Sequence, residues 1–352
     1  MIYSTYNPDE CMFLLKDLTD VMLSTSLEEK EAQIRAGASY SEFITDEKAV
    51  SEHTIQIFKQ LLSEKKRELA GYVATVSEQI LNRYENPILV SLARAGTPVG
   101  VLIRRYVNFK HNRTLPHYSI SIIRGKGIDE NALKHIIRKH GLDNAKNIVF
   151  VDGWTGKGSI TFELQRSIAK FNAENGTMIS DTLSVLADPA KRSSICGTKK
   201  DICIPNACLN STVSGLISRT ILNDAFISAD DFHGAKRFEH LKHQDFSVYF
   251  VDEVAKEFAH VEAQVSDTTT DYEYVEGCLD RIFHDFALSD KNKIKFSIGE
   301  ASRALLRRTP EIMLIKDASN PDLAFLLNLA NEKGVPVRIY DLADYECAVI
   351  IK

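Results

Sequence analysis

Hydrophobic and polar residues follow two different periods along this chain. Four short, largely apolar runs predict buried strands. They lie at residues 88–92, 119–123, 147–151 and 183–188. Between them, apolar residues recur every three or four positions, notably at 130–140 and 159–170, which predicts helices. Because strands that alternate with helices are typical of βαβ units, the pattern predicts an α/β fold with a parallel sheet.

The same pattern divides the chain into three parts. Residues 1–85 predict a helical N-terminal extension, with helices at 49–62 and 66–84. Residues 86–288 carry the strand and helix alternation, followed by a polar, irregular hood. After a charged linker, residues 294–352 show a helix, a strand, a helix and two more strands, which predicts a small second α/β sandwich.

Composition narrows the class of protein. The 352 residues are 44% hydrophobic and 26% charged, as in soluble globular proteins. The net charge of −5 gives no general attraction to nucleic acid or membrane, and no apolar run approaches the length of a membrane span. Six scattered cysteines without a C-x-x-C pair predict reduced thiols and no protein-bound metal. We expect a cytoplasmic protein with no membrane partner, and the sequence leaves homo-oligomerisation open.

A glycine-rich turn follows the third predicted strand. Asp152 ends the apolar run, glycines follow at 153, 156 and 158, and a helix is expected from Ser159. Closely spaced glycines let several N–H groups point into one concavity, and a helix start adds positive charge. The spacing fits neither G-x-x-x-x-G-K-[ST] nor G-x-G-x-x-G. The turn therefore predicts a phosphate-binding loop, and a turn without a ligand is the alternative.

Two further turns follow the first and second predicted strands. Residues 94–97 are Arg-Ala-Gly-Thr, and residues 124–127 are Arg-Gly-Lys-Gly. Ligands of parallel sheets bind at the carboxyl ends of the strands, where Asp188 also lies. Arg94 and Arg124 would supply cations there, and the second turn has the composition of a mobile lid. A solvated basic turn is the alternative for each.

The hood after residue 200 mixes small polar residues with apolar ones. Together with Asp188, its residues Asn210, Ser211, Arg219 and His233 have the composition of a surface that recognises an acceptor molecule. A capped core helix is the alternative. Cys208 with His233 and Asn210 also supplies the residue types of a cysteine protease, although no protease signature surrounds Cys208.

The sequence D-G-W-T-G-K-G-S from Asp152 resembles the ribose-5-phosphate loop of type I phosphoribosyltransferases, and Arg-Ala-Gly resembles their pyrophosphate loop. The resemblance implies a type I phosphoribosyltransferase-like sheet and a transferase acting on phosphoribosyl pyrophosphate or another ribose 5-phosphate compound, with substrate-bound Mg²⁺. It assigns catalysis to Asp152, Arg94 and Arg124. It assigns phosphate binding to Ala95, Gly96, Thr97, Lys126, Gly153, Thr155, Gly156, Lys157, Gly158 and Ser159. Val151 and Gly153 flank Asp152, where that family usually has a second acid.

Residues 294–352 resemble the pelota-type RNA-binding fold, on the stretches GEASRALLRR, LIKDASNPDL and ANEKGVPVRIY. The resemblance implies RNA contacts from Glu300, Arg303, Arg307, Arg308 and Lys316. Gly299 stands where that family has an asparagine, so we expect contacts with phosphates rather than bases. A solvated basic helix face is the alternative.

The whole order of parts is similar to that of bacterial proteins associated with tellurite-resistance and stress gene clusters, a family often labelled cysteine protease StiP. Its most specific mark here is the turn at residues 152–158. We therefore expect a phosphoribosyltransferase-like enzyme of a stress pathway. A metabolite-sensing, RNA-binding regulatory protein is an alternative, and a cysteine protease is another.

Overall fold

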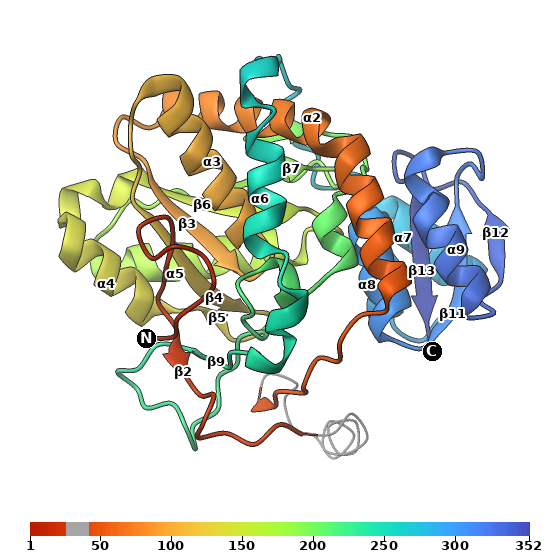
Figure 1. The fold of residues 1–352 in the computed structure, drawn as a ribbon, viewed down its shortest axis with the longest axis horizontal. Coiled ribbons are helices and arrows are strands. Elements are labelled where there is room, and N and C mark those ends of the chain that lie inside the picture. Colours follow the sequence, from red (N-terminus) through yellow and green to blue (C-terminus); the bar gives the residue numbers. More distant parts are fainter. Residues whose placement is uncertain (26–41) are drawn as a thin grey trace.

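A mostly parallel sheet forms the centre of the chain (Figure 1). The computed structural model describes residues 1–25 and 42–352. Within them the larger sheet has the order β1 (Met12–Phe13), β4 (His117–Ile123), β3 (Ile88–Ala93), β6 (Ile148–Trp154), β7 (Leu183–Ala187) and β8 (Cys196–Thr198), all parallel. Strand β5 (Gly127–Ile128) pairs antiparallel with β4. The predicted α/β fold with a mostly parallel sheet is confirmed.

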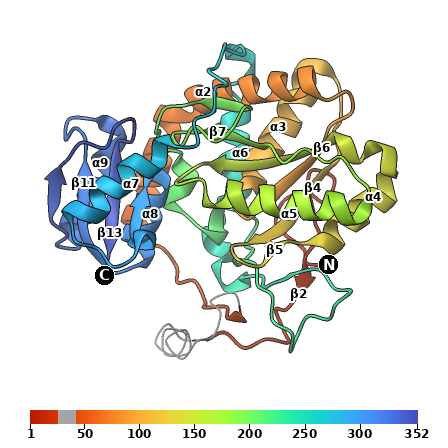
Figure 2. The same ribbon diagram turned by 180° about the vertical axis from the view of Figure 1, so that it is seen from behind.

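Helices cover both faces of this sheet (Figure 2). On one face α2 (Glu52–Arg83), α3 (Gly96–His111) and α6 (Ser247–Ala255) share a core with Leu89 and Val151. On the other face α4 (Glu130–His140) and α5 (Ser159–Asn175) pack on Val90 and Phe150. Because successive strand residues point to opposite faces, apolar runs without alternation are the pattern of a sheet buried on both sides.

The N-terminal extension differs from the one expected. Helix α2 is continuous where two helices were expected, because the polar residues 63–66 are Ser, Glu, Lys and Lys, of which Glu and Lys favour helix. The side chain of Ser51 accepts a hydrogen bond from the Thr54 N–H and begins the helix. Ahead of α2, strand β1 joins the sheet and β2 (Lys16–Asp17) pairs with β9 (Gly234–Ala235) in the hood.

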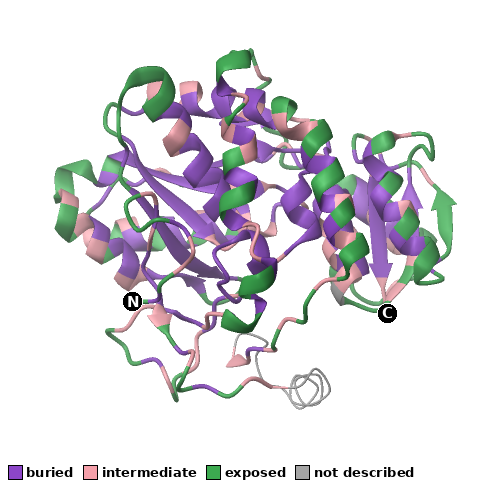
Figure 3. Ribbon diagram, viewed as in Figure 1, coloured by how far each residue is buried: buried purple, intermediate pink, exposed green. Residues whose placement is uncertain are grey.

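The C-terminal residues form a second sheet, in the order β10 (Ile294–Phe296), β13 (Cys347–Ile351), β11 (Pro310–Ile315) and β12 (Val337–Ile339). Helix α7 (Tyr274–Asp285) packs on one face of it. On the other face, α8 (Ser297–Arg307) and α9 (Ala324–Glu332) belong to the same hydrophobic cluster as α2 and the hood. The two domains therefore share a buried interface, and Figure 3 shows exposed residues mainly on the outer helix faces and loops.

Short 3₁₀ helices complete the described elements. They are η2 (Leu142–Asn147), η3 (Pro205–Cys208), η4 (Ser211–Val213), η5 (Glu239–Gln244), η6 (Phe258–His260), η7 (Lys291–Lys293) and η8 (Pro321–Leu323). The hood at 200–246 contains three of them and little other regular structure. None of the helices in the described ranges is long and apolar enough to cross a membrane.

Candidate functional site

The turns after β3 and β6 lie against each other. A Cβ atom on Gly96 would stand 3.1 Å from the Cα of Asp152, and one on Gly153 would stand 3.8 Å from the Ala95 carbonyl oxygen. Thr97, the residue after Gly96, is buried, and its hydroxyl lies 2.8 Å from the Ser119 hydroxyl on β4. The structure thus brings these predicted residues together at the carboxyl ends of the strands, as parallel topology requires.

Asp188 fixes the base of the glycine-rich turn. Its carboxylate accepts hydrogen bonds from the Thr155 hydroxyl (2.6 Å), the Lys199 ammonium (2.7 Å) and the backbone N–H of Ser193 (2.8 Å). The side chain is fully buried, so these donors satisfy a charge that would otherwise be costly. Asp188 and Thr155 therefore hold the turn in place. The sequence had predicted acceptor recognition for Asp188 and phosphate binding for Thr155.

Helix α8 of the C-terminal domain covers the middle of the turn. The Tyr345 hydroxyl donates a hydrogen bond to the Gly156 carbonyl oxygen at 2.7 Å, and a Cβ on Gly156 would stand 2.7 Å from the Glu300 Cγ. Arg303 lies over the Trp154 ring, 4.4 Å from its centroid. Glu300 and Arg303, predicted to contact RNA, thus contact the core and each other through a 3.2 Å ion pair.

Asp152 lies beneath this contact. Burial raises the pKa of its carboxyl to about 6, against the opposing effects of a hydrogen bond from the Gly153 N–H and of the nearby Arg303 charge. A single carboxylate with a raised pKa can accept or release a proton near neutral pH. Within the described residues no group of three His, Cys, Asp or Glu side chains could hold a metal, and the substrate-bound Mg²⁺ stays a prediction.

Four cations gather where the turn meets the C-terminal domain. Lys157 donates to the Lys291 carbonyl oxygen at 3.0 Å, and burial, with Lys295 and Arg124 nearby, lowers its pKa to about 8. Burial also lowers the pKa of Lys295, with Arg308 and Arg124 acting in the same direction and Glu300 in the opposite one. We call Arg124, Lys157, Lys295 and Arg308 the basic seam. Sequence reasoning missed Lys295, which stands in β10 with no motif around it.

Apart from Arg124, the remaining residues predicted for the lid and for RNA contacts do not form one cluster. Lys126 and Arg124 are exposed, and Arg124 donates to the Asn292 side chain at 2.6 Å. Lys316 is exposed and donates to the Ala343 carbonyl oxygen. The side chain of Arg307 lies outside the described part of the structure. Ser159 begins α5.

Arg94 faces the hood rather than an open anion site. It forms an ion pair with Glu47 and donates to the Ile217 carbonyl oxygen at 2.9 Å. Glu47 also accepts hydrogen bonds from the backbone and side chain of Ser211. Arg219 donates to the Phe43 carbonyl oxygen. The Asn210 side-chain oxygen is buried without a hydrogen-bond partner among the described residues. Through Glu47 and Phe43, the segment after residue 42 is therefore bound to Arg94 in the core and to Ser211 and Arg219 in the hood.

His233 lies at another part of the sheet. Its Nδ1 is 2.8 Å from the Ser121 hydroxyl at the end of β4, and its backbone N–H donates to Asp129 at 2.6 Å. Strands β3 and β6 lie between β4 and β7, which places the Ser121 and Asp188 positions about 14 Å apart. His233 and Asp188 therefore do not form one acceptor site.

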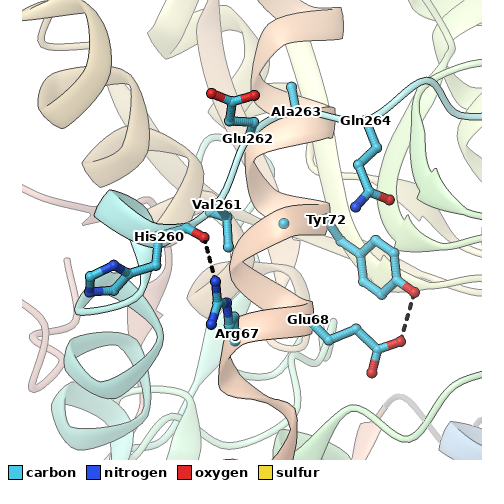
Figure 4. A pocket seen from close by; sticks show the side chains of 9 residues that line it. Arg67, Glu68, Tyr72, His260, Val261, Glu262, Ala263 and Gln264 are labelled. Carbon is cyan, nitrogen blue, oxygen red and sulfur yellow. Dashed lines mark hydrogen bonds between the residues drawn. The ribbon is translucent and has the colours of Figure 1, made fainter.

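A groove of about 600 Å³ lies between α2 and the chain at 260–264 (Figure 4). Arg67 donates across it to the His260 carbonyl oxygen, and the Tyr72 hydroxyl donates to Glu68 on its own helix. None of the residues predicted for the site lines this groove.

Comparison with known proteins decides the family. Residues 4–255 match the family model described as "Tellurite-like stress resistance cysteine protease StiP", and residues 276–352 match "PELOTA RNA binding domain". A curated relative from Acinetobacter baylyi, named "Cysteine protease StiP", is 33% identical over 99% of this chain and 94% of its own length. The chain belongs to the StiP family.

A solved structure also aligns with this StiP-family chain. It is titled "Crystal structure of an hypothetical protein", and it is 12% identical at a TM-score of 0.23 over 59% of this chain and 88% of its own. A TM-score this low does not establish a common fold.

The phosphoribosyltransferase function predicted above is wrong by this comparison. The StiP family model and the relative both carry the name of a cysteine protease, and neither names a transferase or binding of phosphoribosyl pyrophosphate. The ion pair of Arg94 with Glu47 gives a physical reason, because the cation expected to meet pyrophosphate is already neutralised. The stress family and the C-terminal pelota domain are confirmed.

The protease name of the StiP family makes the thiols important. All six cysteines are buried. Burial raises the pKa of Cys208, and the neighbouring Cys203 acts in the same direction, while His233 contacts Ser121. The only Cys–His contact among the described residues joins Cys11 Sγ to His117 Nε2 at 3.8 Å. Burial raises the pKa of Cys11 and lowers that of His117 to about 4, so this pair is neutral as it stands.

Proposed function

We propose that this StiP-family protein acts in stress resistance by binding RNA along the basic seam. The observation that supports the proposal is the gathering of four cations from both domains at one place. Lys157 and Lys295 are partly buried near Arg124, with the carboxylates of Asp290 and Glu300 opposing these like charges, and a polyanion would relieve the repulsion that is left. Because the whole chain has a net charge of −5, general attraction cannot account for such binding.

The seam suits phosphates rather than bases. Lysine and arginine side chains fix the position of a nucleic acid by contacting its backbone, and they carry little sequence information. The first helix of the C-terminal domain has Gly299 packed against Trp154, so it does not present a base-reading side chain at that position. We therefore expect weak binding that depends on RNA structure and on salt.

A fluorescence anisotropy titration of the full chain tests this function. The probes are a kink-turn RNA, an unrelated hairpin and a single strand of equal length. We expect binding of structured RNA at low salt, and a loss of at least about tenfold in affinity in the double variant Lys157→Met/Lys295→Met. Equal affinity of the parent and the double variant would place any RNA site elsewhere.

A thiol protease is the second candidate, favoured by the relative's name and by the Cys11–His117 contact. His117 Nδ1 lies 2.9 Å from the Glu10 carbonyl oxygen, which orients the ring, and Nε2 lies 2.7 Å from the Ser91 hydroxyl, a contact that the Cys11 thiol would have to replace. The N-terminal segment would have to open to expose the pair. Casein hydrolysis that Cys11→Ala abolishes and Cys278→Ala retains would establish it, and retention in both variants would exclude Cys11.

The type I phosphoribosyltransferase-like topology of the larger domain stays a prediction. The glycine-rich turn at the end of a parallel strand supports it.

A further inference from the structure

Residues 260–264 cross α2 as a segment without helix or strand structure, and we call them the crossing segment (Figure 4). The His260 carbonyl oxygen accepts a hydrogen bond from Arg67. At the other end, the Gln264 N–H donates to the Thr75 hydroxyl at 2.9 Å. Both contacts are made with α2, so the segment is fixed to that helix at its two ends.

The other edge of the crossing segment carries free backbone groups. Val261 has a φ of −132° and a ψ of 155°, the dihedral angles of a β-strand. In an extended chain the polar groups of alternate residues point the same way, so those of Val261 and Ala263 point away from α2. Their N–H and carbonyl groups have no hydrogen-bond partner among the described residues. A backbone edge in this state can pair with an additional strand.

A second groove, of about 560 Å³, lies along the crossing segment. Phe109 and Lys110 at the end of α3 form one wall, and residues 258–262 form the other. None of its lining residues belongs to α2, so it lies on the side where the backbone groups are free. Phe109 is 56% exposed, and its ring centroid lies 6.2 Å from that of Phe258, which gives the groove an apolar wall.

The groove also holds two charges of opposite sign. Lys110 and Glu262 both line it and are exposed, and neither side chain makes an ion pair or a hydrogen bond with a described residue. A ligand that carries the complementary charges can therefore contact both without breaking an existing ion pair.

We propose that this groove binds an extended peptide of a partner protein, in which an apolar residue lies between an acidic and a basic one. The peptide backbone pairs with the free edge of the crossing segment, as in the addition of a strand to a sheet. Its apolar side chain packs on Phe109, and its charged side chains face Lys110 and Glu262. The groove contains no residue of the basic seam, and the proposal does not rest on RNA binding.

Fluorescence anisotropy of a labelled heptapeptide, Thr-Glu-Val-Ile-Val-Lys-Thr, tests the groove on the full chain, and the reversed sequence covers the other strand direction. Alternate residues share one face of a strand, so the glutamate, isoleucine and lysine point the same way. We expect saturable binding of one of the two peptides. N-methylation of its central residues should weaken binding at least about tenfold, because main-chain hydrogen bonds supply the affinity in this mode.

Variants at exposed positions test the wall formed by α3. Phe109→Ser should weaken binding about tenfold through lost apolar contact. Lys110→Glu should weaken it about three- to tenfold, and a peptide with lysine in place of its glutamate should recover the loss. The controls are Leu142→Ser, at an apolar side chain that is 57% exposed, and Lys146→Glu, at an exposed lysine, and both should leave binding within about twofold.

Three results would overturn the proposal. They are no binding of either peptide, equal binding of the N-methylated peptide, and unchanged binding in Phe109→Ser or Lys110→Glu. Sedimentation velocity of the parent without peptide adds a fourth. Self-association that Phe109→Ser abolishes would assign the groove to a second copy of the chain instead of a peptide.

Discussion

The guanidinium of Arg303 stacks on the indole of Trp154, 4.4 Å from the ring centroid. This contact joins the last residue of β6 to the first helix of the C-terminal domain. Gly299 and Glu300 on the same helix face pack against the same turn. The helix that sequence assigned to RNA thus serves in part as an interface to the core, and of the four seam cations only Arg308 adjoins it.

Gly299→Ala should loosen that interface. Its Cβ would collide with the Trp154 ring, and the shifts that such overpacking forces typically lower the free energy of unfolding by about 1–3 kcal/mol. Trp154 is the only tryptophan in the chain, so its fluorescence reports on the contact directly. We expect a red-shifted emission and faster quenching by acrylamide. Gly277→Ala, in α7 with open space around it, is the control and should leave both unchanged. An unshifted Gly299→Ala spectrum would contradict the packing described.

Asp201 should make the docking of the two domains pH-dependent. It accepts hydrogen bonds from the backbone N–H groups of Ile298 and Glu346, and burial raises its pKa to about 7, against those hydrogen bonds. The ordinary value is 3.8, so the folded state binds the proton more tightly than the unfolded state. The resulting stability is complete below about pH 4 and is lost as pH rises to about 7.

Urea unfolding between pH 4 and pH 7 tests whether the free energy of unfolding falls as the pH rises. The pKa difference corresponds to about 4 kcal/mol, a figure that already includes the opposing effect of the hydrogen bonds to the carboxylate. Asp201→Asn should flatten the decline between pH 4 and pH 7, whereas Asp317→Asn, at an exposed loop, should retain it. A parent whose stability rises over this interval would show that Asp201 stays ionised in the fold.

The secondary structure could be predicted because it depends on local pattern. The runs at β3, β6 and β7 are largely apolar, β4 alternates Ser119 and Ser121 with apolar residues, and Asp129 and Gly141 bound α4 at the predicted residues. The break expected in α2 was wrong, because local pattern does not distinguish the two cases: a polar stretch of Glu and Lys continues a helix as readily as it ends one.

The site was harder to predict because its contacts join distant residues. Glu47 neutralises Arg94, and Asp188 binds Thr155 from the next strand. A glycine-rich turn looks the same in sequence whether a ligand or a second domain covers it. Nothing near Phe109 in the sequence shows that residues 258–262 form the other wall of its groove.

The thiols should be inert in the native protein. Burial raises the pKa of Cys11, Cys208 and Cys347 well above the ordinary thiol value, and the thiolate is the reactive form. Mass spectrometry after iodoacetamide treatment at pH 7.5 should find all six cysteines unmodified until urea is added. Rapid modification of Cys11 alone would reveal an open state and would favour the protease candidate over the RNA-binding function.

The salt dependence of RNA binding shows whether the basic seam contacts phosphates. Four phosphate contacts at the basic seam predict a slope of about −4 for the logarithm of affinity against that of salt concentration, at the coefficient for a duplex. Lys295→Met should make the slope shallower by about 0.9. Lys256→Met, an exposed lysine after α6, should change nothing. A titration of the full chain with hairpin RNA at several salt concentrations that gave this ordering would support the seam, and an identical slope in all three proteins would contradict it.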